Sequence, residues 1–202
     1  LNRFVEEERP FIYNVVIDSK DRDRTRYTSP ALFTIDFSPT QHNGSEGVNT
    51  GFIDIAFGNV MSCELLDIIL LDTSAENDAS DYTGASPKLP YLLLDIHELG
   101  SNYHGTNDEL SRSFAMLTSY QVLNGYKYYN VNCDNSSNTI TKIYNPRVNI
   151  TRMTIKLKKP DGTLYSFGSS AESNTNTVFQ ITFRITALKK NLDTSFLNKA
   201  IF

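Results

Sequence analysis

The sequence predicts an all-β protein: an antiparallel β-sandwich, built as a single jelly roll of about eight strands, with one short helix near 107–117. Three observations lead to this prediction. Apolar and polar residues alternate along several segments, and turn-forming pairs such as Asn124-Gly125 separate these segments. The 202 residues also suffice for one domain with a substantial core. An immunoglobulin-type sandwich is less favoured, because the chain contains no Trp.

Alternation with a period of two marks the candidate strands. In the segment 178–188 every second residue from Phe179 to Ala187 is apolar, and the residues between them are polar. This pattern is typical of a strand with one side on a core and the other in water. The expected strands lie near residues 11–17, 31–37, 52–57, 63–72, 90–98, 126–132, 138–144, 149–158, 163–167 and 178–188.

Two of these segments, Glu64–Asp72 and Tyr91–Leu99, are apolar at nearly every position. A strand of this kind is either covered on both faces of its sheet or meets a neighbouring molecule. Both interpretations stay open at this point.

One segment is expected to be helical. Leu110, Phe114 and Leu117 follow one another at helical spacing, and Asn107 is suited to cap the helix at its amino end. Asp108 and Glu109 would then lie in the first turn, where the helix dipole favours negative charge.

Charge is distributed unevenly along the chain. The net charge is −4, which argues against a dedicated nucleic-acid-binding protein. Residues 142–202 carry ten Lys and Arg against three Asp and Glu, whereas residues 1–141 carry nine against twenty. Such a chain either presents one basic and one acidic region to a partner or scatters its charges over a solvated surface.

Neither a membrane span nor a disulfide framework is expected. No apolar run reaches the roughly 18–20 residues that cross a bilayer, and the amino end is acidic where a secretory signal is basic. Cys63 and Cys133 are too few for a disulfide scaffold and are expected to be reduced thiols.

Few residues offer catalytic chemistry. The three histidines lie in no recognisable nucleophile motif. The strongest metal-binding alternative combines Asp95, His97 and His104, as in a cupin-like enzyme. A carbohydrate-binding β-sandwich is another alternative. We expect no enzyme activity, no catalytic residue, no cofactor and no metal.

The two ends of the chain are expected to contact other molecules. We divide the chain into an amino-terminal arm (1–10), a jelly-roll domain (11–188) and a carboxyl-terminal tail (189–202). The candidate interface residues are the apolar residues of the arm and the tail: Phe4, Val5, Phe196, Leu197, Ile201 and Phe202. The tail either packs back on the sandwich or docks on a neighbour.

Three stretches together carry a family resemblance. Residues 17–37 contain Ser-x-x-Arg-Asp, from Ser19, and then Tyr-x-x-Pro-x-x-Phe-x-Ile-x-Phe, from Tyr27. Residues 91–117 contain Ile-x-Glu-Leu, Gly-Thr-Asn and Ser-Phe-Ala-x-Leu, and residues 153–168 contain Pro-Asp-Gly-x-Leu-x-x-Phe. In this order and spacing the chain resembles the single jelly-roll minor capsid and penton proteins of large icosahedral double-stranded DNA viruses (nucleocytoplasmic large DNA viruses).

The resemblance implies a structural protein of the virion. It would be a minor capsid component that fastens major capsomers in an icosahedral shell or, alternatively, a penton protein at the five-fold vertices. Its partners would be the major capsid protein and other minor capsid proteins, with a possible homo-oligomer and no specific nucleic acid. It would lie in the capsid after assembly in the host cell cytoplasm. The resemblance transfers no catalytic residue.

Overall fold

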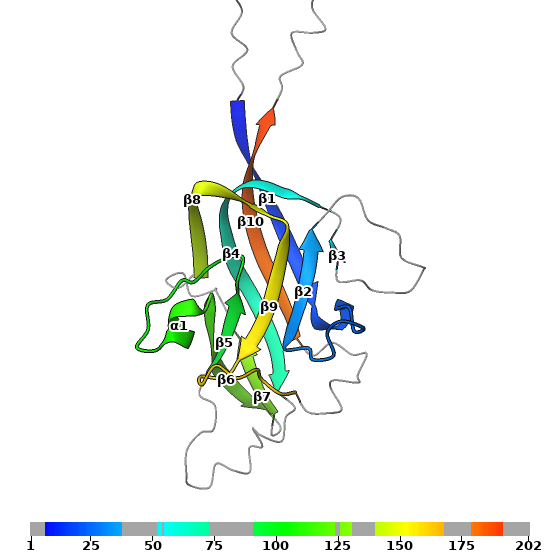
Figure 1. The fold of residues 1–202 in the computed structure, drawn as a ribbon, viewed down its shortest axis with the longest axis vertical. Coiled ribbons are helices and arrows are strands. Elements are labelled where there is room, and N and C mark those ends of the chain that lie inside the picture. Colours follow the sequence, from blue (N-terminus) through cyan, green and yellow to red (C-terminus); the bar gives the residue numbers. More distant parts are fainter. Residues whose placement is uncertain are drawn as a thin grey trace, which may run out of the picture.

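Two layers of antiparallel strands pack face to face in the computed structural model, with a short helix beside them (Figure 1). The structure describes residues 7–37, 52–53, 55–72, 91–123, 126–130, 140–167 and 179–191. Ten strands and one short α-helix are assigned within these residues. No helix among them is long and apolar enough to cross a membrane.

The first layer, which we call sheet A, contains four long strands in the order β1-β10-β4-β8. All three neighbouring pairs are antiparallel. The strands are β1 (Glu7–Asp18), β10 (Phe179–Asn191), β4 (Phe57–Asp72) and β8 (Ile140–Ile150).

The second layer, sheet B, contains four strands in the order β2-β9-β5-β6, again antiparallel. These are β2 (Leu32–Phe37), β9 (Arg152–Lys158), β5 (Tyr91–Ile96) and β6 (Ala115–Leu123). Two short strands are added to this plan. The strand β3 (Phe52–Ile53) pairs in parallel with β2, and β7 (Tyr126–Asn130) pairs with both β6 and β4, so that it joins the two layers along one edge.

The strand order defines the topology. When the eight long strands are counted in chain order, sheet A reads 1-8-3-6 and sheet B reads 2-7-4-5, which is the order of a jelly roll. Within the described strands the path is open, with β1 at one end and β3 at the other. The predicted all-β jelly-roll sandwich is confirmed.

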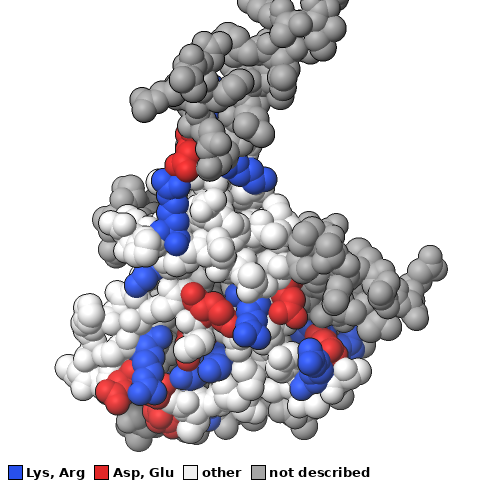
Figure 2. Space-filling model, turned by 45° about the horizontal axis from the view of Figure 1, so that its top comes forward, with Lys and Arg blue, Asp and Glu red and all other residues white. Residues whose placement is uncertain are grey.

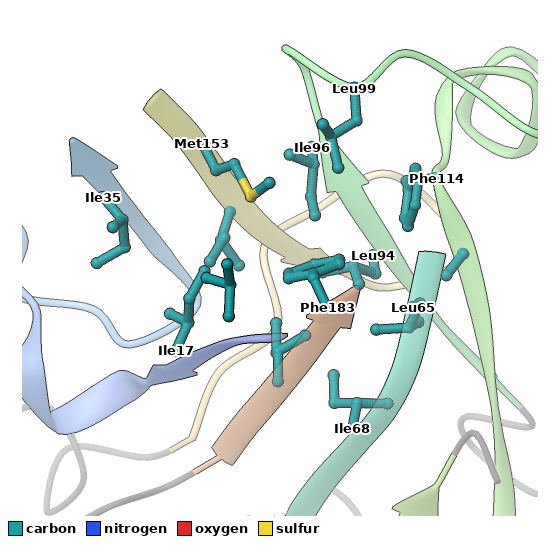
Figure 3. Packing of buried hydrophobic residues seen from close by; sticks show 14 of the residues in the cluster. Ile17, Ile35, Leu65, Ile68, Leu94, Ile96, Leu99, Phe114, Met153 and Phe183 are labelled. Atoms are coloured by element: carbon teal, nitrogen blue, oxygen red, sulfur yellow. The ribbon is translucent and has the colours of Figure 1, made fainter. Parts of the chain in front are cut away.

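The core lies between the two sheets and is made by alternate residues of the facing strands. Figure 3 shows Leu94, Ile96 and Met153 from sheet B pointing toward Leu65 and Phe183 from sheet A. The alternating residues of β10 from Phe179 to Ala187 are all buried, as their pattern predicts. Aromatic rings from the two layers meet edge to face, as between Phe183 of β10 and Phe114, which immediately precedes β6.

The helix α1 (Asp108–Arg112) is confirmed but is shorter than its apolar spacing suggests. The side chain of Asn107 caps it as predicted, accepting a hydrogen bond from Leu110 N at 2.8 Å. The helix ends at Ser113, and the N–H of Phe114 then donates to Leu94 O, which begins the pairing of β6 with β5. Phe114 is therefore buried just before β6 and Leu117 is buried within it, and β6 is a strand that was not predicted.

Three other boundaries differ from the sequence expectation. The expected strand at 52–57 is divided between β3, which ends at Ile53, and β4, which begins at Phe57. The expected strand at 163–167 forms only an isolated bridge between Leu164 and Lys158. Strands β1 and β10 extend beyond the strand limits expected at residues 11 and 188, since residues 7–10 pair with residues 188–191. The candidate interface residues Phe4, Val5, Phe196, Leu197, Ile201 and Phe202 lie outside the described residues.

Candidate functional site

The structure does not bring the candidate metal ligands together. Asp95 is buried on β5, with Oδ2 2.8 Å from Lys158 Nζ, whereas His97 and His104 are both exposed. Among the described residues, no three His, Cys, Asp or Glu side chains converge on a point where they could hold a metal ion. The arrangement therefore gives no support to a metal site at Asp95, His97 and His104.

Lys158 ties the short helix to sheet B. Its ammonium group lies 2.8 Å from Asp95 of β5 and 2.9 Å from Glu109 of α1. Burial acts to lower the pKa of Lys158, but the hydrogen bonds and negative charges of the two carboxylates outweigh burial and leave the pKa above its usual 10.5. Gly162 completes the junction, because a Cβ there would lie 2.7 Å from Glu109 Cδ.

Replacing Lys158 with Gln is expected to lower the free energy of unfolding at pH 7 by about 1–3 kcal/mol, since Asp95 loses its cation in a buried position. The pKa of Lys158 is raised in the folded state, so the ion pair contributes fully below about pH 10 and is lost as the pH rises through the folded-state pKa. Urea unfolding of both proteins at neutral and alkaline pH measures this difference.

The control for this prediction is Lys156→Gln on the same strand, which is expected to change stability by about 0.5 kcal/mol or less. A stability difference between wild type and Lys158→Gln that shows no decrease as the pH rises through the alkaline range in which the ammonium group loses its proton would contradict the assignment of the effect to that charged group.

The Ser-x-x-Arg-Asp motif builds a loop. Arg22 is only 1% exposed, and its guanidinium group donates to three backbone carbonyls: Ser19 O at 2.9 Å, Thr28 O at 3.0 Å and Tyr27 O at 3.1 Å. Asp23 Oδ1 accepts from both the N–H and the hydroxyl of Thr25. Ser19 Oγ accepts from Phe179 N and so ties the loop to the start of β10. The motif residues are committed to contacts within the fold.

The Ile-x-Glu-Leu motif also serves the fold. After β5 ends at Ile96, the carboxylate of Glu98 accepts from Thr154 N at 2.7 Å and from the Thr154 hydroxyl at 2.8 Å. The hydroxyl of Thr154 is also hydrogen-bonded to that of Thr34, which accepts from Tyr27 Oη. Glu98 thus takes the place of a strand neighbour for β9, and polar side chains cover this part of the outer face of sheet B.

Charged residues from the two parts of the sequence are interleaved in space. Because β9 lies between β2 and β5, and β10 lies between β1 and β4, basic residues of the last third face acidic residues of the rest. The ion pairs Arg152–Glu98, Lys158–Asp95 and Arg184–Glu64 follow from this strand order. Lys158 also pairs with Glu109 of α1, and Arg147 of β8 pairs with Glu8 of β1. Figure 2 shows blue and red atoms side by side on the face that it presents, so the uneven sequence produces no patch of one sign there.

The two segments that are apolar on both sides have different surroundings. On β5 the outward side chain of Leu93 is fully buried and α1 packs against the strand, so both faces are covered. On β4 the outward side chain of Ile69 is 51% exposed. The outer face of sheet A therefore leaves apolar side chains uncovered among the described residues.

The sequence predicts this exposed face only in part, through the apolar segment Glu64–Asp72 of β4. Besides Ile69 it carries Ile12 and Val16 of β1, Met61 of β4 and Ile143 of β8. The signal was present in the sequence, because the segment from Phe11 to Ile17 has apolar residues on both sides of the strand. A strand with water on one side does not need them.

Cys63 is a free thiol buried in the core. Burial, with a smaller contribution from Glu64, raises its pKa to about 12, so the thiol stays protonated and unreactive at neutral pH. Cys133 lies outside the described residues.

Comparison with known proteins gives one informative similarity. No protein-family model matches the sequence. An uncharacterized protein of Acanthamoeba polyphaga mimivirus is 32% identical over 127 residues, and the match covers 52% of this chain and 44% of that relative. The chain thus spans less than half the length of the curated relative that it matches. Together, the fold and the similarity describe an all-β sandwich related in part to a giant-virus protein of uncharacterized function.

Proposed function

We propose that this chain is a structural protein of the virion of a large double-stranded DNA virus, a minor capsid component that fastens major capsomers in an icosahedral shell. Its partners would be the major capsid protein and other minor capsid proteins. Its function would be mechanical, with many modest contacts repeated by the symmetry of the shell.

The observation that supports this proposal most directly is the jelly-roll strand order in a chain that is similar to a mimivirus protein. Jelly rolls occur in viral capsids, but also in lectins and cupins, so the fold alone does not choose among these functions. The surroundings of the motif residues favour the structural role, because Arg22, Asp23 and Glu98 all bond to backbone or side chains of their own domain.

A structural role also fits the chemistry of the buried polar groups in the part of the chain described here. Asp95, the most deeply buried carboxylate in that part, is neutralised by Lys158. We propose on this basis that the protein has no catalytic centre.

Mass spectrometry and cryo-electron microscopy of purified virions test the proposal. We expect the chain in particles at a fixed ratio to the major capsid protein, with its density beneath or between capsomers. Absence from purified particles, together with presence in infected cells, would overturn the proposal. Metal bound at one equivalent and lost in a His97→Ala variant would instead favour the enzyme alternative.

Deleting residues 192–202 is expected to leave the domain folded but to reduce its incorporation into particles. Strand β10 ends at Asn191, so the deletion removes no residue of any described strand, whereas it removes four apolar candidate interface residues. Thermal unfolding of the purified variant and its abundance in particles measure the two effects. A matched variant in which Phe196, Leu197, Ile201 and Phe202 are replaced by Ser separates apolar contact from tail length. A large loss of thermal stability would show that the tail packs on its own domain.

A further inference from the structure

We propose that the outer face of sheet A is a dimer interface, on which a second copy of this chain packs the same face. This inference does not depend on the capsid role, and either can fail without the other.

The uncovered apolar side chains of the described residues are concentrated on this face. Among the described residues, seven large hydrophobic side chains are exposed, and five of them belong to the outer face of sheet A. These five are Ile12, Val16, Met61, Ile69 and Ile143. The exposed fraction reaches 66% for Ile12 and 75% for Ile143. Apolar groups gathered on one face of a domain mark a contact surface more often than scattered ones do.

The opposite outer face of the sandwich is built differently. On sheet B, the helix α1 covers β5, and the hydroxyls of Tyr27, Thr34 and Thr154 form a hydrogen-bonded chain that ends on Glu98. Those polar groups already have partners and suit contact with water. The two outer faces therefore differ, and within the described strands the exposed apolar side chains gather on sheet A.

The strand register arranges the side chains of this face in rows that cross the sheet. One row contains Ile12, Thr186, Ser62 and Ile143. The next row contains Asn14, Arg184, Glu64 and Thr141. In the centre of the second row Arg184 Nη1 lies 3.1 Å from Glu64 Oε2. The first row thus has an isoleucine at each end, and the second has an ion pair in its middle.

These rows are complementary to themselves. A two-fold axis parallel to the strands and midway between β10 and β4 exchanges β1 with β8 and β10 with β4, and it places each row opposite its own copy. Ile12 of one copy then faces Ile143 of the other, and Arg184 faces Glu64, so apolar meets apolar and opposite charges meet. This is the condition for an isologous interface, in which one patch serves both subunits. In these two rows a second copy therefore supplies complementary partners without any change of sequence.

The size of the face sets the expected affinity. Four strands at about 4.8 Å spacing and seven residues at about 3.3 Å each give a flat area of roughly 400 Å², about half the roughly 800 Å² per partner of a standard stable interface. We therefore expect a monomer–dimer equilibrium with a dissociation constant on the order of micromolar.

Sedimentation velocity of the full chain over a range of about 1–200 μM tests the inference. We expect wild type to shift from monomer to dimer with concentration, and Ile143→Lys and Ile12→Lys each to weaken dimerisation by about tenfold or more. Leu164→Lys is the matched control, because Leu164 is an exposed apolar residue outside sheet A, in the isolated bridge with Lys158. Thermal unfolding verifies that each variant is folded. A wild type that stays monomeric at about 200 μM, a stable pentamer, or a dimer that is indifferent to Ile143→Lys would each overturn the proposal.

A charge exchange tests the geometry. Arg184→Glu places like charges opposite each other in both halves of the dimer and is expected to weaken it by about tenfold. The double variant Arg184→Glu/Glu64→Arg exchanges the two charges and is expected to restore dimerisation. Failure of the double variant to recover, while it remains folded, would contradict the proposed two-fold arrangement.

Discussion

The Phe183→Asp variant is expected to be recovered only as unfolded or insoluble protein. Phe183 is fully buried in the middle of β10, where its ring lies 6.1 Å from that of Phe114 across the two sheets (Figure 3). Losing a buried Phe ring costs about 3–5 kcal/mol, and burying an unpaired carboxylate costs several more. A domain with a total stability of about 5–15 kcal/mol does not tolerate this sum.

Two further variants keep this prediction specific to the core. Phe183→Leu keeps an apolar side chain and is expected to cost about 1–2 kcal/mol, with cooperative urea unfolding retained. Thr186→Asp introduces the same carboxylate on the outward side of the same strand and is expected to cost about 1 kcal/mol or less. A soluble Phe183→Asp protein with a cooperative transition would show that the inward side of β10 is wrongly assigned.

The parts of the fold that the sequence predicted are those in which local pattern and tertiary surroundings agree. The alternation from Phe179 to Ala187 and that from Phe33 to Phe37 both lie in strands with one buried face, and burial follows the alternation residue by residue. Alternation of apolar and polar residues with a period of two indicates a strand with one buried face, and no other regular structure fits it.

The start of β6 shows where local pattern is insufficient. Leu110, Phe114 and Leu117 have the spacing of a helix, yet only Leu110 is helical. The N–H of Phe114 bonds to Leu94 O of a strand that lies twenty residues earlier in the sequence. Pairing with β5 gives this segment a buried position in sheet B, and no local signal reports that pairing.

The surface properties were harder to predict, because they depend on which strands become neighbours. Within the described residues, basic side chains of the last third of the chain pair with acidic ones, because β9 lies beside β5 and the turn after it, which carries Glu98, and β10 lies beside β4, which carries Glu64. The apolar face of sheet A appears only when Ile12 and Ile143, which are distant in sequence, fall into one row of the register. For Phe4, Val5 and the tail residues, the interface assignment stays a prediction from the sequence.

Replacing Arg22 with Ala is expected to lower the free energy of unfolding by about 3–5 kcal/mol. The substitution leaves the carbonyls of Ser19, Tyr27 and Thr28 without the guanidinium donor and opens a cavity in a site that is 1% exposed. Each buried carbonyl that loses its partner costs about 1–3 kcal/mol, reduced where water reaches it. Urea unfolding at neutral pH measures the loss.

Arg22→Lys separates the geometry of the group from its charge. An ammonium group keeps the positive charge but cannot donate in a planar fork to three carbonyls, so we expect it to recover less than half of the lost stability. Arg24→Ala, an exposed neighbour in the same loop, is expected to change stability by about 0.5 kcal/mol or less.

These three variants also decide what the Ser-x-x-Arg-Asp motif does. If Arg22 holds the loop between β1 and β2, its loss destabilises the domain, and the effect extends to the start of β10 through the bond from Phe179 N to Ser19 Oγ. Hydrogen exchange of the Phe179 amide should then accelerate in Arg22→Ala and remain unchanged in Arg24→Ala. If Arg22→Ala were instead as stable as wild type but failed to enter particles, the motif would be a contact site. Arg22, which is buried in the isolated chain, would then have to become exposed on assembly.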